Sequence, residues 1–137
     1  MANVCTAYVT FQGSEAKLNK LLRDLNLAKR QDQGFTLPCV GTPTDGYIFD
    51  ADIERTEDSL ILSFWTRWAP INDSIGKMCY HYKVDACYQY EELSNGIFGT
   101  SVHNPKESKD YQLDVDDVFG RHSIQHLEKL MKEKFNL

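Results

Sequence analysis

The chain has 137 residues, of which 42% are apolar and 26% charged, and its net charge is −5. This composition is that of an ordinary globular protein and excludes an intrinsically disordered chain, because enough apolar surface is available for burial. The negative charge counts against nucleic acid as a partner, and no apolar run approaches the roughly 20 residues of a membrane span. We therefore expect a single domain, residues 1–137, with no membrane association.

The four cysteines are Cys5, Cys39, Cys79 and Cys87, and no two of them form a C-x-x-C pair. We interpret them as free and mostly buried thiols in a reducing compartment. The first residues show no basic stretch followed by a long apolar core. We therefore expect no signal peptide and a cytoplasmic protein.

The first elements follow from side-chain periodicity. Residues 4–12 alternate, with Val9 on one face and Tyr8 on the other, and this pattern predicts a strand. Residues 15–28 place four leucines at helical spacing, so we expect a helix there. Residues 30–46 are dense in glycine, proline and polar side chains and predict a long loop, a kind of segment that is often functional.

Two further strands should form a hairpin, over residues 47–54 and 59–66. The alternation in the first of them sorts its residues onto two faces. We expect one face to hold Tyr47, Phe49, Ala51 and Ile53, and the opposite face to hold Ile48, Asp50, Asp52 and Glu54.

The remaining elements include a second helix, which begins near Pro70 and continues to about Tyr82. Strands over residues 84–92 and 97–103 follow it, separated by a turn. Residues 105–137 form a C-terminal extension, in which we expect a short strand over residues 111–115 and a helix that contains Ile124, Leu127, Leu130 and Met131.

The predicted order is β-α-β-β-α-β, followed by one more strand and a helix. The first six elements match the split β-α-β arrangement of the ferredoxin-like fold, so we predict an α+β protein of that class with an added edge strand. The two helices should cover one face of the sheet and leave the other face partly open. The sequence does not settle whether the C-terminal helix covers that open face.

Three segments resemble a known family. They are Asn3 to Gly13, the run Phe64-Trp65-Thr66-Arg67-Trp68-Ala69-Pro70, and Tyr90 to Gly99 with its glycine-containing hairpin. In this order they resemble the YubB-type ferredoxin-like domain of small plasmid and phage proteins. The resemblance implies a ferredoxin-like fold and a setting on mobile genetic elements, in the host cytoplasm where the protein is phage-encoded. It implies no catalytic residue.

The open sheet face is the best candidate binding surface. If Val9 and Phe64 face the helices, then Tyr8, Trp65 and Arg67 face outward, and Trp68 lies at the adjoining corner. Aromatic side chains on such a face can stack on single-stranded nucleic acid or contact a protein. The predicted acidic side chains of the neighbouring strand would repel phosphate, which favours a protein partner.

Other candidate chemistry is weaker. His122 and His126 are one helical turn apart, but no third metal ligand is apparent, so we predict no metal site. Asp50, Asp52 and Glu54 fit no calcium-binding loop, and Cys5 and Cys79 lie on apolar faces typical of inert thiols. No phosphate-binding or dinucleotide motif is present, so we predict no cofactor.

Three hypotheses follow. The first is a non-enzymatic binding module of a phage or plasmid, which acts by protein surface contact in counter-defence or on another host factor, through Tyr8, Trp65, Arg67, Trp68 and the 30–46 loop. The second is a small-ligand or nucleotide-binding protein, or a small enzyme, and the third is single-stranded nucleic-acid binding. A second copy of the same chain, in a homodimer, is a further alternative partner.

Overall fold

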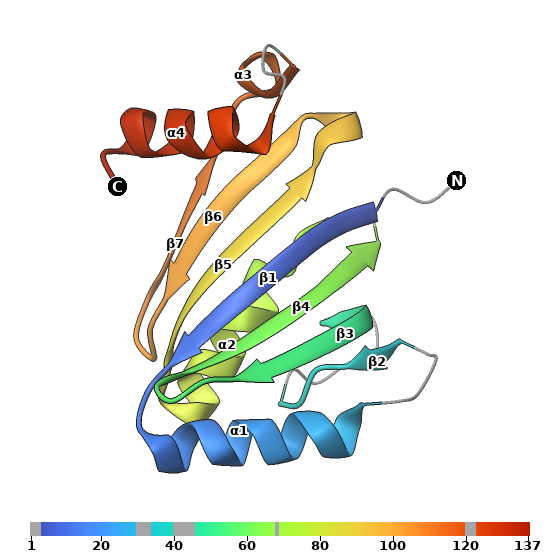
Figure 1. Ribbon diagram of the computed structural model, residues 1–137, viewed down its shortest axis with the longest axis vertical. Coiled ribbons are helices and arrows are strands. Elements are labelled where there is room, and N and C mark those ends of the chain that lie inside the picture. Colours follow the sequence, from blue (N-terminus) through green and yellow to red (C-terminus); the bar gives the residue numbers. More distant parts are fainter. Residues whose placement is uncertain (1–3, 30–33, 40–45, 68, 120–122) are drawn as a thin grey trace.

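The computed structural model describes residues 4–29, 34–39, 46–67, 69–119 and 123–137. Twelve elements lie within these residues, and Figure 1 shows their arrangement. In chain order they are β1 (Val4–Gln12), α1 (Glu15–Ala28), β2 (Phe35–Thr36), β3 (Tyr47–Arg55), β4 (Ser59–Arg67), α2 (Asn72–Tyr82), β5 (Asp85–Glu92), the short 3-10 helix η1 (Leu93–Asn95), β6 (Ile97–His103), β7 (Ser108–Gln112), α3 (Val115–Phe119) and α4 (Ile124–Phe135).

The strands form one antiparallel sheet in the order β2-β3-β4-β1-β5-β6-β7. Its central four strands, β3-β4-β1-β5, together with α1 and α2, have the ferredoxin-like arrangement, and this confirms the predicted fold class. The added strand β6 lies beside β5, where the sequence predicts an extension of the edge. The sheet then continues one strand further, to β7.

The main core lies between the sheet and the two helices α1 and α2. Ser14 caps α1 by accepting a hydrogen bond from the backbone N–H of Lys17, and the buried side chains of α1 are Leu18, Leu21 and Leu25. The sheet side chains that meet them are large and fully enclosed, among them Phe11, Leu62 and Tyr88. Burial of these side chains supplies most of the free energy that holds the helices to the sheet.

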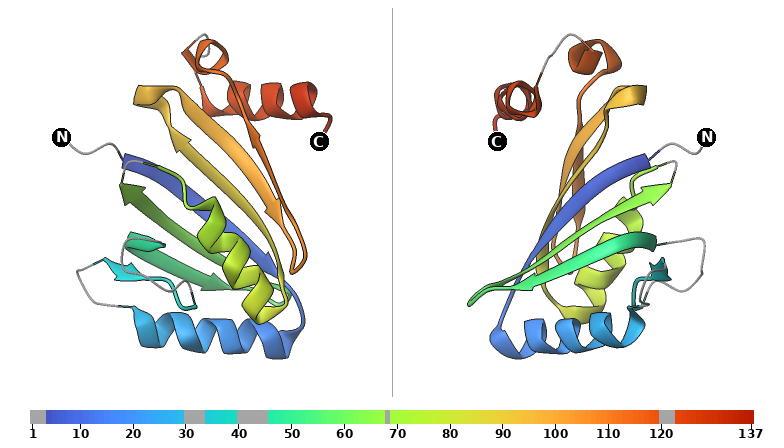
Figure 2. Two further views of the ribbon diagram at one scale, coloured as in Figure 1. Left: turned by 180° about the vertical axis from the view of Figure 1, so that it is seen from behind. Right: turned by 45° about the vertical axis from the view of Figure 1, so that its right-hand side comes forward.

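The C-terminal helix α4 lies on the opposite face of the sheet, as the two views in Figure 2 show. It closes a second, smaller core, whose buried members are Phe98, Leu113, Val118, Leu127 and Met131. Lys134 of α4 forms ion pairs of 3.1 Å with Asp114 and 3.0 Å with Asp117, which join the helix to the segment of α3. Among the described residues, α4 therefore covers the open face over β6 and β7 and leaves it uncovered over β1, β4 and β3.

The predicted alternation of β3 is wrong in its first half. Asp50 adopts a left-handed conformation with φ of 52°, and the pairing with β4 shifts between Phe49 and Asp52. Such a bulge adds one residue and reverses the faces of the residues before it. Ile48 is consequently buried in the main core, whereas Phe49 lies on the outer face against Trp65 of β4.

The C-terminal extension also differs from the prediction. The added strand is Ser108–Gln112 rather than residues 111–115, because it pairs along β6 from His103 back to Gly99. A short helix, α3, precedes α4 where none is predicted. Within the predicted 30–46 loop, Phe35–Thr36 adds a two-residue strand to the sheet edge, paired with Ile48 and Tyr47.

Candidate functional site

The uncovered half of the outer sheet face carries the predicted binding residues. Tyr8 of β1 is 42% exposed, Arg67 at the end of β4 is exposed, and Trp65 is half-buried. The pairing of Thr6 with Trp65 and of Tyr8 with Ser63 places Tyr8 diagonally across from Trp65. Diagonal neighbours on antiparallel strands are about 7–8 Å apart, so long side chains at these positions form one surface.

An aromatic stack forms the centre of this surface. The rings of Phe49 and Trp65 are stacked with centroids 4.1 Å apart and an interplanar angle of 14°. The guanidinium carbon of Arg67 lies 4.9 Å from the centre of the Phe49 ring, and Tyr47 packs its ring against Phe49 edge to face. The Trp65 indole N–H donates a 2.6 Å hydrogen bond to a carboxylate oxygen of Asp50. Stacking and hydrogen bonding therefore fix the orientation of the rings.

Tyr8 marks the boundary between the two halves of the face. Its hydroxyl donates to Gln89 Oε1 at 2.9 Å, and Gln89 Nε2 donates to Glu128 of α4 at 3.3 Å. A shallow hollow of about 270 Å³ separates the start of α4 from the sheet here. Partial burial, and then the negative charge of Glu128, raise the pKa of Tyr8, so its hydroxyl stays protonated and donates the hydrogen bond to Gln89 at physiological pH.

Carboxylates surround the aromatic stack. Asp52 and Glu54 of β3 are exposed and lie opposite Ser63 and Ile61 of β4 on the outer face. Glu91 of β5 accepts a hydrogen bond from Thr6 on the same face. This surface therefore combines flat aromatic rings with negative charge, a combination that repels a phosphate backbone.

The structure brings together three of the four predicted binding residues. Tyr8, Trp65 and Arg67 lie on one face, and Trp68 lies outside the described residues. Most of the predicted 30–46 loop is likewise outside them. Phe49 was not predicted on this surface, because the bulge at Asp50, which an alternating sequence pattern does not reveal, turns its side chain outward.

The burial of the four cysteines agrees only in part with the prediction. Cys5 and Cys79 are buried, and desolvation raises the pKa of Cys5 to about 11 and that of Cys79 to about 12, so both thiols are protonated and unreactive. Cys39 and Cys87 are exposed, contrary to the expectation of mostly buried thiols. All four are free.

A metal site is not apparent in the described part of the chain. No three His, Cys, Asp or Glu side chains there are grouped so that they could hold a metal ion. His126 is exposed on α4, and its predicted companion His122 lies outside the described residues. No described helix is long and apolar enough to cross a membrane.

Comparison with known proteins places the chain in a family. The family model described as the ferredoxin-like domain in Api92-like protein matches residues 48–128, from β3 into α4 and thus more than half of the chain. No curated protein and no solved structure matches this chain. The expected ferredoxin-like family is thereby confirmed, whereas the YubB type and the plasmid or phage setting stay predictions. The chain belongs to the family of ferredoxin-like domains in Api92-like proteins.

Proposed function

We propose that the protein is a binding module that engages a protein partner through the uncovered half of its outer sheet face and performs no chemistry there. The observation that carries this proposal is the ordered stack of Phe49 on Trp65, with Arg67 alongside. Aromatic and arginine side chains are enriched at the energetically dominant positions of protein interfaces. Rings already held in place lose little conformational entropy when a partner binds.

The charges around the stack indicate the chemistry of the partner. Asp52, Glu54 and Glu91 flank it, and Arg67 is the cation beside it. A partner with an apolar or aromatic centre and basic side chains at its rim would complement this surface, since opposite charges steer association and suppress wrong partners. The same carboxylates count against single-stranded nucleic acid, which otherwise uses exposed aromatic rings.

The resemblance to small plasmid and phage proteins extends the proposal. A binding module in that setting would act on a host protein, such as a defence factor, in the host cytoplasm. A basic rim on such a factor is consistent with a nucleic-acid-binding protein, because these proteins carry clustered lysine and arginine. The proposed partner class is therefore a basic host protein.

Substitution of Trp65 tests the binding surface. Immobilised wild-type protein is compared with Trp65→Ala and with Tyr80→Ala, whose aromatic ring is 66% exposed on α2, on the other face of the sheet. We expect a partner captured from host lysate to be retained by Tyr80→Ala and lost by Trp65→Ala, with both variants folded by circular dichroism. Equal capture by Trp65→Ala would contradict the proposal.

Two further measurements separate the other hypotheses. Binding of single-stranded DNA that weakens steeply with salt would favour the nucleic-acid function over a protein partner. A melting temperature raised by a nucleotide or metal ion would favour a small-ligand function, because a ligand that binds only the native state stabilises it. We expect neither effect.

A further inference from the structure

A chain of hydrogen bonds runs from a surface groove to buried side chains on the face of the sheet that α2 covers. Ser108 Oγ lies 2.6 Å from His103 Nδ1, and His103 Nε2 lies 2.7 Å from Ser101 Oγ. Ser101 Oγ in turn donates to the side-chain oxygen of Asn72, at 2.7 Å. The four residues come from β7, β6 and the first turn of α2, so the fold and not a local loop brings them together.

The direction of each hydrogen bond follows from the last acceptor. The Asn72 amide oxygen can only accept, so Ser101 donates its hydroxyl proton there. The Ser101 oxygen then accepts from a protonated His103 Nε2. His103 Nδ1 is left with its lone pair and accepts the hydroxyl proton of Ser108. The imidazole is therefore held as a neutral base against a serine hydroxyl.

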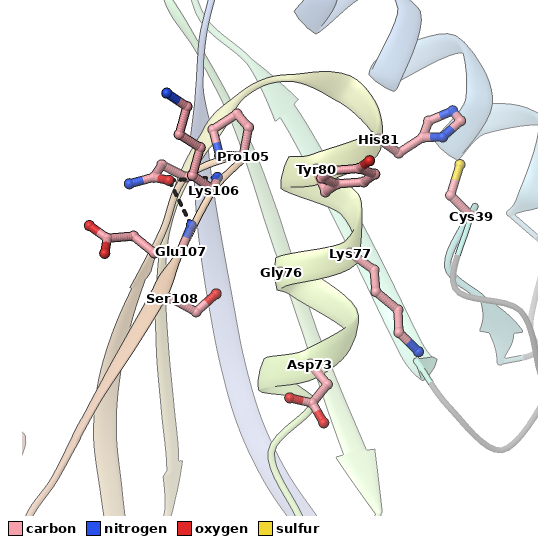
Figure 3. A pocket seen from close by; sticks show the side chains of 11 residues that line it. Cys39, Asp73, Gly76, Lys77, Tyr80, His81, Pro105, Lys106, Glu107 and Ser108 are labelled. Carbon is pink, nitrogen blue, oxygen red and sulfur yellow. Dashed lines mark hydrogen bonds between the residues drawn. The ribbon is translucent and has the colours of Figure 1, made fainter.

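The inner part of this chain is buried and its outer end is accessible. Ser101 is fully buried and His103 is 4% exposed, whereas Ser108 is exposed. Ser108 lines a groove of about 560 Å³ between α2 and the β6–β7 hairpin, and Figure 3 shows its hydroxyl pointing toward α2. Gly76 of α2 leaves room for it, because a Cβ there would lie 3.1 Å from Ser108 Oγ.

We propose that Ser108 is a nucleophile for acyl transfer, with His103 as its general base and Ser101 and Asn72 as positioning residues. A nucleophile, a base within hydrogen-bond reach and a third group that orients the base are the recognisable parts of an activated serine site. This site lies on the opposite side of the sheet from the proposed binding surface and does not depend on it.

The reaction is ester hydrolysis in two steps. Ser108 Oγ attacks the ester carbonyl carbon while its proton passes to His103 Nδ1; the bond from that carbon to the alcohol oxygen breaks, and the departing alcohol takes the proton. Water then attacks the acyl-serine, gives a proton to His103 Nδ1, and the bond to Ser108 Oγ breaks as the serine recovers that proton. The products are the acid and the alcohol.

The groove indicates which esters would react. The backbone amides of Lys106 and Glu107 in the hairpin already donate to Asn104 Oδ1, at 2.8 and 2.9 Å. These two N–H groups already donate hydrogen bonds and so do not serve as donors to a developing oxyanion. In acyl-transfer enzymes, stabilisation of that oxyanion supplies a large part of the rate enhancement. The substrate class is accordingly an activated ester with a good leaving group.

The protonation state of His103 suits a general base. Burial lowers its pKa from the ordinary 6.5, and the carboxylates of Asp110 and Asp73 oppose that shift without cancelling it. The other charged or titratable side chains lining the groove are Cys39, Lys77, Tyr80, His81, Lys106 and Glu107. The rate of acylation should thus stay level near neutral pH and fall only below pH 6.5.

The test is acylation of the full chain. The protein is incubated with p-nitrophenyl acetate and, separately, with a fluorophosphonate, in a Cys39→Ser background because the Cys39 thiol lines the same groove. We expect one adduct on Ser108 by peptide mapping, none in Ser108→Ala, and about 100-fold slower labelling in His103→Gln, the scale of general-base catalysis. Ser94→Ala, at an exposed serine of η1, should label as the parent does.

Asn72 provides the test of positioning. Asn72→Asp keeps an oxygen acceptor for Ser101 and should retain labelling, but its added carboxylate raises the pKa of His103, so labelling should begin to fall at a higher pH than in the parent. Asn72→Ala should lose most of the labelling while remaining folded. Labelling of Ser108→Ala at the parent's rate, or equal labelling of Asn72→Ala and the parent, would overturn the proposal and leave the hydrogen-bond chain as a structural feature only.

Discussion

The outer face of the sheet has two halves, and they differ in whether the C-terminal helix α4 covers their aromatic side chains. Over β6 and β7, α4 buries Phe98 and partly buries Tyr111, which packs on Phe135 with ring centroids 5.2 Å apart. Over β3 and β4, Phe49 and Trp65 stack on each other, and no helix in the described part of the chain covers them. Aromatic side chains in one half hold the fold together, and those in the other half form the surface that we propose binds a partner.

The C-terminal extension determines which half of the outer face is our candidate binding surface. A ferredoxin-like sheet with helices on one face leaves its other face exposed to solvent unless another element covers it. The C-terminal extension covers only the half that extends beyond the central strands. The uncovered half keeps its rings ordered by stacking and by the hydrogen bond from Trp65 to Asp50. Partly exposed, ordered aromatic rings of this kind are common at interaction surfaces.

The largest expected effect comes from the covered half. Leu127 of α4 is 2% exposed in the second core. We expect Leu127→Ala to lower the free energy of unfolding by about 2–4 kcal/mol, from lost burial and the cavity left behind. Urea denaturation measures it, and binding of a hydrophobic dye reports whether Phe98 becomes exposed.

Leu27 supplies the control for that measurement. It lies on α1, is 76% exposed, and its change to Ala should alter stability by less than about 0.5 kcal/mol. If Leu127→Ala were as mild as Leu27→Ala, α4 would not be packed on the sheet. The two halves of the outer face would then be equally open to solvent, and the distinction between a covered and an uncovered half would be wrong.

The covered half also differs on its inner side, where β6 buries His103. Since its pKa is lower in the folded chain than the ordinary 6.5, the unfolded chain binds the proton first as pH falls. Stability is therefore complete above about pH 6.5 and decreases below it, by at most about 1.4 kcal/mol per pH unit for one group.

Denaturation midpoints measured across that pH range check this expectation. His103→Gln removes the titrating group, and the difference in slope between the two proteins isolates its contribution. A slope that persists unchanged in His103→Gln would show that other groups cause it. It would also remove the support that the pKa gives to His103 as a general base.

Periodicity was enough to predict the main architecture. The bounds of α1 agree with the prediction, since Ser14 and the spacing of the leucines specify both its start and its buried stripe. The β-α-β-β-α-β order follows in the same way and determines the fold class. Tyr8, Trp65 and Arg67 were placed on the outer face because each lies on a strand whose alternation is regular.

The failures occur where one residue breaks a regular pattern. The bulge at Asp50 reversed the faces of Ile48 and Phe49, and a period of two cannot anticipate an inserted residue. The hydrogen-bond chain of Ser108 was missed for another reason. Its members lie on α2, β6 and β7. The pairing of β6 with β7 places His103 beside Ser108, and the position of α2 over β6 places Asn72 beside Ser101.

The smallest effect that we expect is the coupling free energy between the stacked rings of the uncovered half. A double-mutant cycle of Phe49→Ala and Trp65→Ala in urea denaturation measures the coupling of the stacked rings, for which we expect about 0.5–1.5 kcal/mol. The matched cycle pairs Trp65→Ala with Tyr80→Ala across the sheet, where the effects should add within about 0.5 kcal/mol. A coupling between Phe49 and Trp65 no larger than that of the matched pair would mean that the rings do not hold each other in place. A partner would then have to order them on binding, and the uncovered half would lose the preorganisation on which its proposed role depends.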